Sequence, residues 1–352
     1  MFANLRRKYD LTDFILWLIG AALLIAIIYG SYVTLASGKY TTEQWINFVI
    51  FGLAQGGIYA LIALGYTMVY GILGMITFAH GDFFMFGTFG AFFMAQALAA
   101  SGLLESNWII SILLMLVAAM LVAATTAVLS ERLAYRPLRR APRLVPLITA
   151  IGVSYFLQYT ARGLFGSGVE AFPNVPALAG ALTIGPIKIQ NTQVAVFIAT
   201  AVLLTLLWLF VSKTKIGRAI RSVAEDKDAA ALMGVDVDRT IAITFAVGGI
   251  MAGAAGVMYG LVFRQVAFYM GFVPGLKAFT AAVLGGIGNL AGAVLGGLIL
   301  GVIESVGPSL FLDGIGIPSP HQLKDGIAFT VLVLILIFRP TGILGERLSK
   351  RA

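Results

Sequence analysis

The sequence has no cysteine among its 352 residues and only two histidines. The first absence excludes structural disulfides, thiolate metal sites and cysteine nucleophiles. The second leaves little for a histidine-built metal centre, so we expect neither a metal nor another cofactor. Charged residues are also scarce, at 11%, against about a quarter in soluble proteins. A folded chain of this size therefore has too little polar surface to face water on all sides.

Apolar residues, in contrast, make up 59% of the chain, and the mean hydropathy is +0.95. Soluble domains reach only about 45–50% apolar content even with glycine included, so the composition predicts an integral membrane protein. The net charge of +8 would suit nucleic-acid binding in a soluble protein. In a membrane protein, Lys and Arg gather in short cytoplasmic loops, so we assign the charge to topology and expect no nucleic-acid partner.

Stretches without Asp, Glu, Lys or Arg indicate where the chain crosses a bilayer, because a core about 30 Å thick takes roughly 20 apolar residues per helix. They predict an all-α, polytopic transmembrane helix bundle of about ten membrane segments, two of them short or broken. The first segment is too long for a signal peptide, so we expect it to remain as a helix. The expected segments are 14–36, 45–66, 70–100 (broken), 107–130, 144–165, 193–212, 241–263, 276–288 (short), 290–305 and 323–338.

The basic residues predict the orientation of this bundle. Four segments, 1–13, 131–143, 213–240 and 339–352, carry 18 of the 24 Lys and Arg residues. The positive-inside rule places all four in the cytoplasm, and with them both termini. The remaining long loops, 166–192 and 304–324, are expected on the external side, where they would meet an external partner.

Glycine recurs inside the apolar segments in two ways. Small-xxx-small spacings predict closely packed helices; they are Gly52 with Gly56, Gly292 with Gly296, and Gly297 with Gly301. Glycines also interrupt 70–82, which ends in His80 and Asp82, and 284–292, which contains Asn289. Broken helices in corresponding positions of two halves indicate a transport pathway. The alternative is that His80 and Asp82 cap a helix at the membrane interface.

Common nucleotide-binding and hydrolase motifs are absent from the sequence. Residues 286–291 match the letters of a dinucleotide fingerprint, but they lie in a charge-free membrane segment and not in a βαβ unit. The P-loop, the H-E-x-x-H zinc motif and the G-x-S-x-G nucleophile elbow do not occur. We therefore predict a chain that is not an enzyme.

The loop at 213–240 is the most charged part of the chain, with six basic and five acidic residues. Apolar residues at Ile220, Val223, Leu232 and Met233, with alanine between them, predict a short surface helix. Gly234 is expected to cap its C-terminus. Such a helix would dock against another protein, and the alternative is an ordinary solvated loop.

Three separated motifs resemble one family. The run GGIYALIALGYTMVYGILGMITFAHGD from Gly56 to Asp82, the loop from Gly217 to Gly234, and GLKAFTAAVLGGIG from Gly275 to Gly288 are similar to the membrane permease subunit of branched-chain amino-acid ABC importers. Within that family the chain resembles the LivH-type subunit. The likeness covers about residues 45–345 as one permease domain and leaves the helix at 14–36 as an N-terminal addition.

This resemblance implies a permease subunit in the bacterial inner membrane that forms a translocation path together with a second, LivM-type permease. Its other partners would be two cytoplasmic ATPase subunits and a periplasmic substrate-binding protein. The implied cargo is a branched-chain amino acid, or a related amino acid, amide or urea. Thr77 stands where the family usually has Asn, and Gly57 where it often has Ser, which leaves the exact substrate open.

The resemblance also implies that the charged loop is a coupling helix that docks on the ATPase. Within it, Glu225, Asp226, Ala229 and Gly234 are expected to form the docking core, with Arg218 and Arg221 holding the loop in place. A bulky residue at Gly234 is expected to permit membrane insertion but uncouple ATP hydrolysis from uptake. The full docking segment is Gly217, Arg218, Ala219, Ile220, Arg221, Ser222, Val223, Ala224, Glu225, Asp226, Lys227, Asp228, Ala229, Ala230, Ala231, Leu232, Met233 and Gly234.

Polar residues at membrane depth usually face a cavity or a partner. On this basis we expect Gln55, Tyr59, Thr77, His80 and Asn289 to line the translocation path. Gln55 and Tyr59 are four residues apart and share one helix face.

Three other functions are consistent with parts of the sequence. A secondary transporter of small polar solutes would also use broken helices, but it should carry charges inside the membrane, for which only Asp82 is a candidate. An intramembrane enzyme that uses His80 and Asp82 lacks a nucleophile at a recognisable spacing. A homo-oligomeric channel leaves the 217–234 segment without a purpose.

Overall fold

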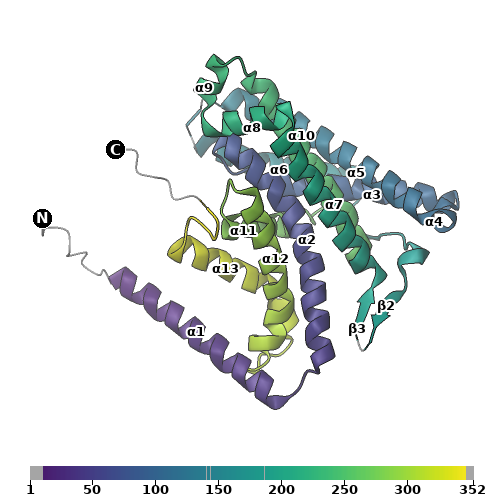
Figure 1. Ribbon diagram of the computed structural model, residues 1–352, viewed down its shortest axis with the longest axis vertical. Helices are drawn as coiled ribbons and strands as arrows, with labels where there is room; N and C mark the ends of the chain where they lie inside the picture. The colour runs from purple at the N-terminus through teal and green to yellow at the C-terminus, as the bar shows by residue number, and fades with distance from the viewer. Residues whose placement is uncertain (1–10, 140, 143, 186, 346–352) are drawn as a thin grey trace, which may run out of the picture.

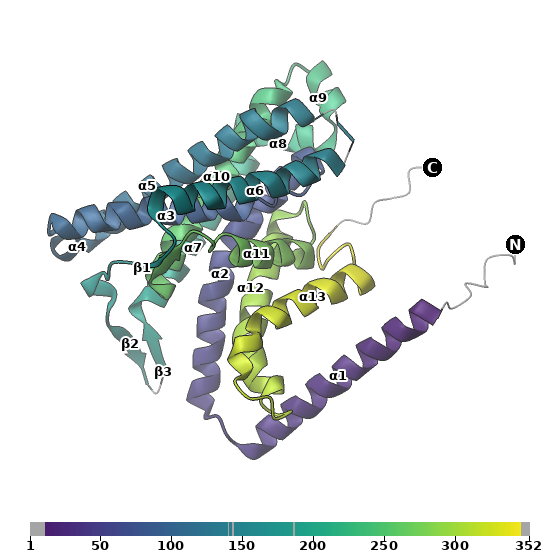
Figure 2. The same ribbon diagram turned by 180° about the vertical axis from the view of Figure 1, so that it is seen from behind.

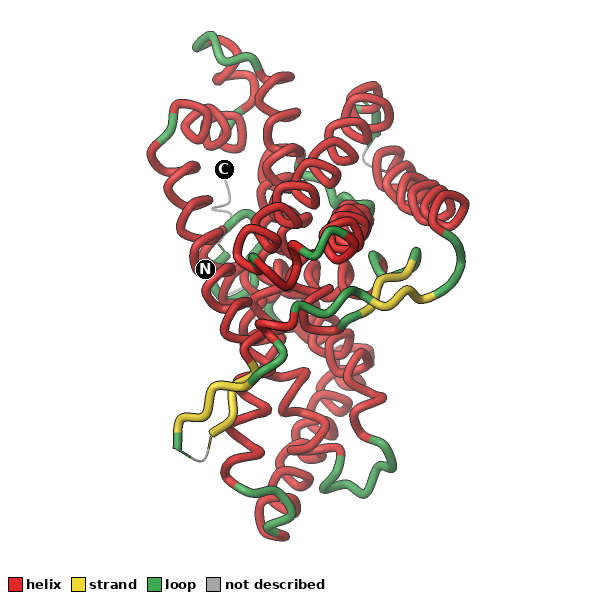
Figure 3. The backbone as a smooth tube through the Cα atoms, turned by 90° about the vertical axis from the view of Figure 1, so that its right-hand side faces the viewer, coloured by secondary structure: helices red, strands yellow, loops and turns green. Residues whose placement is uncertain are grey.

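The computed structural model describes residues 11–139, 141–142, 144–185 and 187–345. Nearly all of its regular structure is helical, and the few strands lie in connecting segments (Figure 3). The long helices are α1 (Leu11–Ser37), α2 (Thr42–Leu73), α3 (His80–Ala100), α5 (Trp108–Ser130), α6 (Leu144–Phe165), α7 (Asn191–Lys213), α10 (Val237–Phe263), α12 (Leu290–Gly307) and α13 (Lys324–Phe338).

Shorter elements connect these helices. The short α-helices are α4 (Leu103–Ser106), α8 (Lys215–Glu225), α9 (Lys227–Leu232) and α11 (Phe272–Gly285). Single 3-10 or π turns are η1 (Glu131–Tyr135), η2 (Arg136–Leu138), η3 (Pro176–Leu178), η4 (Pro308–Leu312) and η5 (Pro320–Leu323). Two antiparallel pairs complete the fold: β1 (Val169–Ala171) with β4 (Gln265–Ala267), and β2 (Ala181–Ile184) with β3 (Ile187–Gln190).

Within the described residues, nine helices are long and apolar enough to cross a membrane, and α11 is a shorter apolar helix. The prediction of a polytopic helical bundle is therefore confirmed. One predicted boundary was wrong, because α2 does not end near residue 66 but continues as a single helix to Leu73. Gly74 then adopts a left-handed conformation (φ +67°), and its N–H donates to the carbonyl of Tyr70 at 2.7 Å. The break falls in residues 74–79, before α3 begins at His80.

A second boundary also differs from the sequence prediction. The segment 304–324 was expected to be a loop, but α12 continues through Glu304 and leads directly into η4. Pro308 has no N–H to continue the α-helical hydrogen bonds, and the chain passes there from α12 into the π turn.

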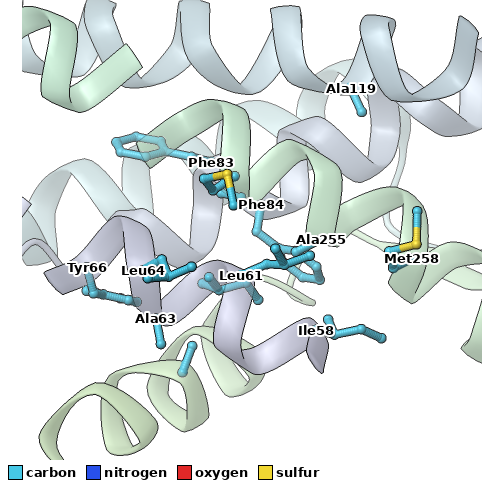
Figure 4. Packing of buried hydrophobic residues seen from close by; sticks show 14 of the residues in the cluster. Ile58, Leu61, Ala63, Leu64, Tyr66, Phe83, Phe84, Ala119, Ala255 and Met258 are labelled. Atoms are coloured by element: carbon cyan, nitrogen blue, oxygen red, sulfur yellow. The ribbon is translucent and has the colours of Figure 1, made fainter. Parts of the chain in front are cut away.

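The core of the bundle forms around α2, which contacts helices from both halves of the chain. Figure 4 shows Ile58 and Leu61 of α2 packed with Phe83 and Phe84 of α3 and with Met258 of α10. All five side chains are at most 1% exposed. The outward faces of α5, α6 and α7 are apolar as well, since large side chains there are exposed, which is the pattern expected for a surface in lipid.

The predicted glycine contacts are confirmed and now have partners. Gly52 and Gly56 on α2 face Gly297 and Gly301 on α12, and a Cβ added to Gly56 would lie 2.7 Å from the carbonyl oxygen of Gly297. The remaining pair, Gly292 and Gly296, instead approaches the backbone of α11. The small residues therefore bring α12 close to α2 on one side and to α11 on the other.

Helix α1 stands apart from the bundle and approaches it mainly at its C-terminal end (Figure 2). There Gly30 meets the backbone of Phe311 and Gly314. At its other end, Trp17 packs edge-on against Phe338 of α13, with ring centroids 5.9 Å apart. The predicted helix at 14–36 therefore exists, as Leu11–Ser37. Most of the predicted cytoplasmic N-terminus, residues 1–10, lies outside the described residues.

The loop at 213–240, predicted to be cytoplasmic, and the loop at 166–192, predicted to be external, lie at opposite ends of the bundle. In Figure 1 the α8–α9 pair lies at the top and the β2–β3 hairpin at the lower right. This separation agrees with a chain that crosses the membrane between them. The assignment of the α8–α9 end to the cytoplasm is a prediction from the basic residues.

Candidate functional site

The segment predicted as one docking helix is two helices, and Asp226 separates them. Its backbone is extended (φ −154°, ψ 113°) and ends α8. Its carboxylate Oδ1 accepts hydrogen bonds from the N–H groups of Asp228 at 2.9 Å and Ala229 at 3.0 Å, and so begins α9. The single-helix prediction was wrong because no glycine or proline marks the break in the sequence. The break is instead made by Asp226, whose side chain caps the start of the second helix.

The end of this segment is as predicted. Gly234 has φ +83°, its N–H donates to the carbonyl of Ala231 at 3.0 Å, and the N–H of Val235 donates to Ala230 at 3.0 Å. These two bonds form a Schellman motif, which requires a left-handed residue and therefore favours glycine.

The docking segment has one buried and one exposed face. Ile220, Val223 and Ala230 are at most 5% exposed, and α8 packs against α2, α7 and α10. Gly217 makes the corner after α7 possible, because any Cβ there would collide with the carbonyl oxygens of Phe210 and Val211. Of the four apolar residues that predicted the helix, Ile220 and Val223 therefore anchor the segment in the bundle, whereas Leu232 and Met233 face outward.

Those outward-facing residues, Leu232 and Met233, are 89% and 85% exposed at the tip of the α8–α9 pair. Elsewhere on the α8–α9 pair, Arg218, Arg221, Glu225 and Asp228 are exposed and form no ion pair with any described residue. The pair therefore presents exposed apolar side chains together with exposed charges, a combination that protein interfaces use in their core and rim.

A charge network fixes the base of this end of the bundle. Arg139 pairs with both Glu131 and Asp238, and Arg136 pairs with Asp238 at 2.7 Å. Partial desolvation, with the nearby Arg139 as a second cause, lowers the pKa of Lys227 below its usual value. The loop after α5, the start of α10 and the start of α9 therefore belong to one electrostatic cluster.

A cavity of about 610 Å³ opens at the opposite end, beside the β2–β3 hairpin seen in Figure 1. Of the predicted pathway residues, Gln55 lines it, and its Nε2 donates to the hydroxyl of Tyr59 at 2.6 Å. These two residues are therefore brought together as expected. The lining residues are Asn47, Phe48, Phe51, Gln55, Ala181, Lys188, Gln190, Gln193, Glu304, Ser305, His321 and Lys324.

A buried ion pair lies next to this cavity. Lys277 of α11 is 3% exposed and pairs with Glu304 of α12, which is 2% exposed. Lys277 also contacts Asp325 of α13 at 2.6 Å and lies 5.8 Å from the ring centroid of Tyr59. Asp82 was the only charged residue expected inside the bundle, and Lys277 and Glu304 are buried there as well. Lys277 is the second residue of the expected segment 276–288, and Glu304 is the last but one of the expected segment 290–305.

The other predicted pathway residues lie elsewhere. Thr77 and His80 lie within the glycine-interrupted stretch 70–82, and both are 1% exposed. The ring of His80 packs against that of Tyr66, with centroids 4.7 Å apart. Asn289 caps α12, because its Oδ1 accepts from the N–H of Gly292 at 2.9 Å and its Nδ2 donates to Leu344 at 3.0 Å. The five residues therefore do not line one common cavity within the described structure.

The two glycine-interrupted stretches nevertheless meet in space. Ile76 from the first and Ile287 from the second line the same small cavity, together with Tyr66 and Phe279. This juxtaposition of segments about 210 positions apart fits the expectation that two broken helices come together in corresponding places.

His80 and Asp82 do not cap a helix at an interface. Both are 1% exposed inside the bundle, and no side-chain hydrogen bond caps the start of α3. Neither ring nitrogen of His80 and neither carboxylate oxygen of Asp82 has a hydrogen-bond partner among the described residues. The capping interpretation failed because both side chains are buried and neither bonds a backbone N–H at the start of α3.

Comparison with known proteins identifies the family. Residues 48–336 match the family model described as the permease component of the branched-chain amino acid transport system. The chain belongs to this permease family. The high-affinity branched-chain amino acid permease protein BraD of Pseudomonas aeruginosa is 43% identical over 307 residues, covering 86% of this chain and 95% of that protein. LivH of Escherichia coli is 41% identical over 312 residues, covering 87% and 96%.

The similarity extends to a more distant relative. A probable branched-chain amino acid permease protein LivH of Methanocaldococcus jannaschii is 25% identical over 301 residues, covering 83% of this chain and 90% of that protein. The chain is accordingly a multi-pass membrane permease component and not an enzyme, as the sequence predicted. Helix α1 lies outside the residues that the family model matches.

Proposed function

We propose that this chain is the LivH-type subunit of an inner-membrane ABC importer for branched-chain amino acids. In this assembly it pairs with a second, LivM-type permease and receives cargo from a periplasmic binding protein. Two cytoplasmic ATPase subunits supply the energy, and the α8–α9 pair docks on them. Closure of the ATPase dimer moves the docking segment and shifts the bundle between inward-facing and outward-facing states.

The exposed tip of the α8–α9 pair is the observation that carries the proposal. A chain without a P-loop needs an ATPase partner to drive uptake, and Leu232 and Met233, at 89% and 85% exposure, offer an apolar surface for one. This tip continues through Ile220 and Val223 into the bundle, where α8 packs on α2. Force applied at the tip therefore reaches the helix at the centre of the core.

The test replaces Leu232 and Met233 by serine in a tagged chain that is coexpressed with the second permease and the ATPase subunits. The wild-type chain is expected to copurify with ATPase subunits and to support ATP-dependent leucine uptake in vesicles. The double variant is expected to lose at least nine-tenths of the copurifying ATPase and of the uptake, because truncating a hot-spot residue at the centre of an interface costs about 2 kcal/mol or more. Membrane insertion should be normal, since neither side chain packs in the bundle.

A matched control places the same change at the other end. Leu182 on β2 is 50% exposed, and Leu182→Ser should leave ATPase copurification unchanged. Full copurification of the Leu232→Ser, Met233→Ser variant would remove the docking role. Uptake by the wild-type chain that follows an ion gradient without ATP would instead support a secondary transporter.

A further inference from the structure

The cavity beside the β2–β3 hairpin collects charges of both signs from separate elements. Glu304 comes from α12, Lys188 from β3, and Lys324 is the first residue of α13. A site for a simple anion or cation would need one sign. A ligand that carries separate positive and negative groups needs both, and the cavity volume of about 610 Å³ lies within the range of about 300–1,000 Å³ that is usual for small-molecule sites.

Two buried acceptors on this cavity lack a donor among the described residues: Oε2 of Glu304 and Oδ1 of Asn47. Lys277 uses the other carboxylate oxygen of Glu304, so Oε2 remains available. A buried acceptor without a partner destabilises the fold, and a charged one does so more strongly. An ammonium group, with three N–H donors, would satisfy such acceptors.

The opposite charge comes from Lys188 and Lys324, neither of which forms an ion pair with any described residue. Two lysine ammonium groups on one cavity suit a carboxylate. Phe48 and Phe51 of α2 line the same space and supply an apolar wall. The cavity therefore combines acceptors for an ammonium, donors for a carboxylate and an aromatic surface for an aliphatic side chain.

We propose that this cavity binds the zwitterion of an aliphatic α-amino acid on the external side of the permease. Glu304 and Asn47 receive the ammonium group, Lys188 and Lys324 receive the carboxylate, and the side chain lies beside Phe48 and Phe51. The site rests on the proposed function, which supplies the amino-acid cargo and the external orientation.

The absence of cysteine from the chain makes a direct test possible. Ala181 lines the cavity, and Ala181→Cys gives this tagged chain a single thiol. The variant is assembled with its permease and ATPase partners, without the binding protein, in right-side-out vesicles and treated with a membrane-impermeant maleimide. Saturating L-leucine is expected to slow labelling at least threefold. Leucinamide, which lacks the carboxylate, and 4-methylpentanoate, which lacks the ammonium, should not slow it at the same concentration.

Two further variants complete the test. Lys39→Cys, at an exposed position outside the lining set, should react at the same rate with and without leucine. Adding Lys188→Ala to Ala181→Cys should abolish the protection by leucine. Lys188 is exposed on the hairpin, so this change does not disturb the helical core, and copurification of the permease and ATPase partners with the tagged chain checks assembly.

Protection by leucinamide or 4-methylpentanoate equal to that by leucine would overturn the zwitterion site, as would unchanged protection in the Lys188→Ala variant or no protection at all. If ATP-dependent uptake by the parent chain persists in any of these cases, only this inference fails. If ATP-dependent uptake is absent as well, the proposed function fails.

Discussion

At the scale of single residues, the most consequential feature is the lysine that lies between two carboxylates. Lys277 pairs with Glu304 and Asp325 within the bundle. Burying ions costs several kcal/mol each, and a pair offsets this cost only while both partners are present. The cluster joins α11, α12 and α13, so it ties α11 to two helices that line the polar cavity.

Removing the lysine alone should therefore destabilise the protein strongly. Lys277→Met leaves Glu304 buried without its cation, which typically costs about 3–5 kcal/mol. The thermal unfolding midpoint of the detergent-purified chain is expected to fall clearly below that of the wild type. Adding Glu304→Gln should recover most of the loss, because the uncompensated charge is removed.

The control for this prediction is Lys39→Met. Lys39 pairs with Asp313 at 2.8 Å, but its side chain is 58% exposed, so its removal should leave the midpoint near that of the wild type. A Lys277→Met chain that unfolds at the wild-type temperature would mean that the cluster has no structural importance.

At the scale of helices, small residues decide how closely α2 and α12 approach. Gly301 has no room for a Cβ, because one would collide with the carbonyl oxygen of Gly52 and with the backbone of Gly56. Gly71 lies in the same helix as Gly52, but a Cβ added there would meet nothing within 4 Å. Glycine is therefore required for the helix contact at Gly301 but not at Gly71.

The two glycines should respond in opposite directions to the same change. Gly301→Ala is expected to lower stability by about 1–3 kcal/mol through overpacking. Gly71→Ala is expected to raise it by about 0.5–1 kcal/mol, because alanine loses less backbone entropy in a helix. Unfolding midpoints of the two purified variants, compared with the wild type, check both signs. A Gly301→Ala chain as stable as Gly71→Ala would show that α2 and α12 do not pack this closely.

At the scale of the whole molecule, the α8–α9 pair and the β2–β3 hairpin lie at opposite ends of the bundle (Figure 1). The basic residues of the loops predict that the first end lies in the cytoplasm. Single cysteines in this cysteine-free chain report the assignment directly, since Met233 and Leu182 are both well exposed, at 85% and 50%.

We expect Met233→Cys to react with an impermeant maleimide in inside-out vesicles only, and Leu182→Cys in right-side-out vesicles only. The reverse pattern would invert the topology. Reaction of both positions from one side would contradict a membrane crossing between them.

Much of this protein follows from local properties of its chain. Composition and the spacing of charges predicted the lipid solvent, the helical bundle and its membrane segments, because a span needs only length and apolarity. Gly234 was predicted as a cap, since a left-handed residue after an apolar helix favours glycine. The glycine spacings predicted close helix contacts but not their partners, because spacing along one helix does not specify the helix that packs on it.

The polar sites depend on contacts between distant parts of the chain. Lys277 and Glu304 are 27 positions apart and meet because α11 and α12 pack side by side. Asn289 was predicted to line the pathway, yet it caps α12 and reaches Leu344. Periodicity and composition are summed along the chain, whereas ion pairs and cavities arise across it. The membrane and the helices were therefore accessible from the amino-acid order, and the charged cavity appeared once the helices were packed.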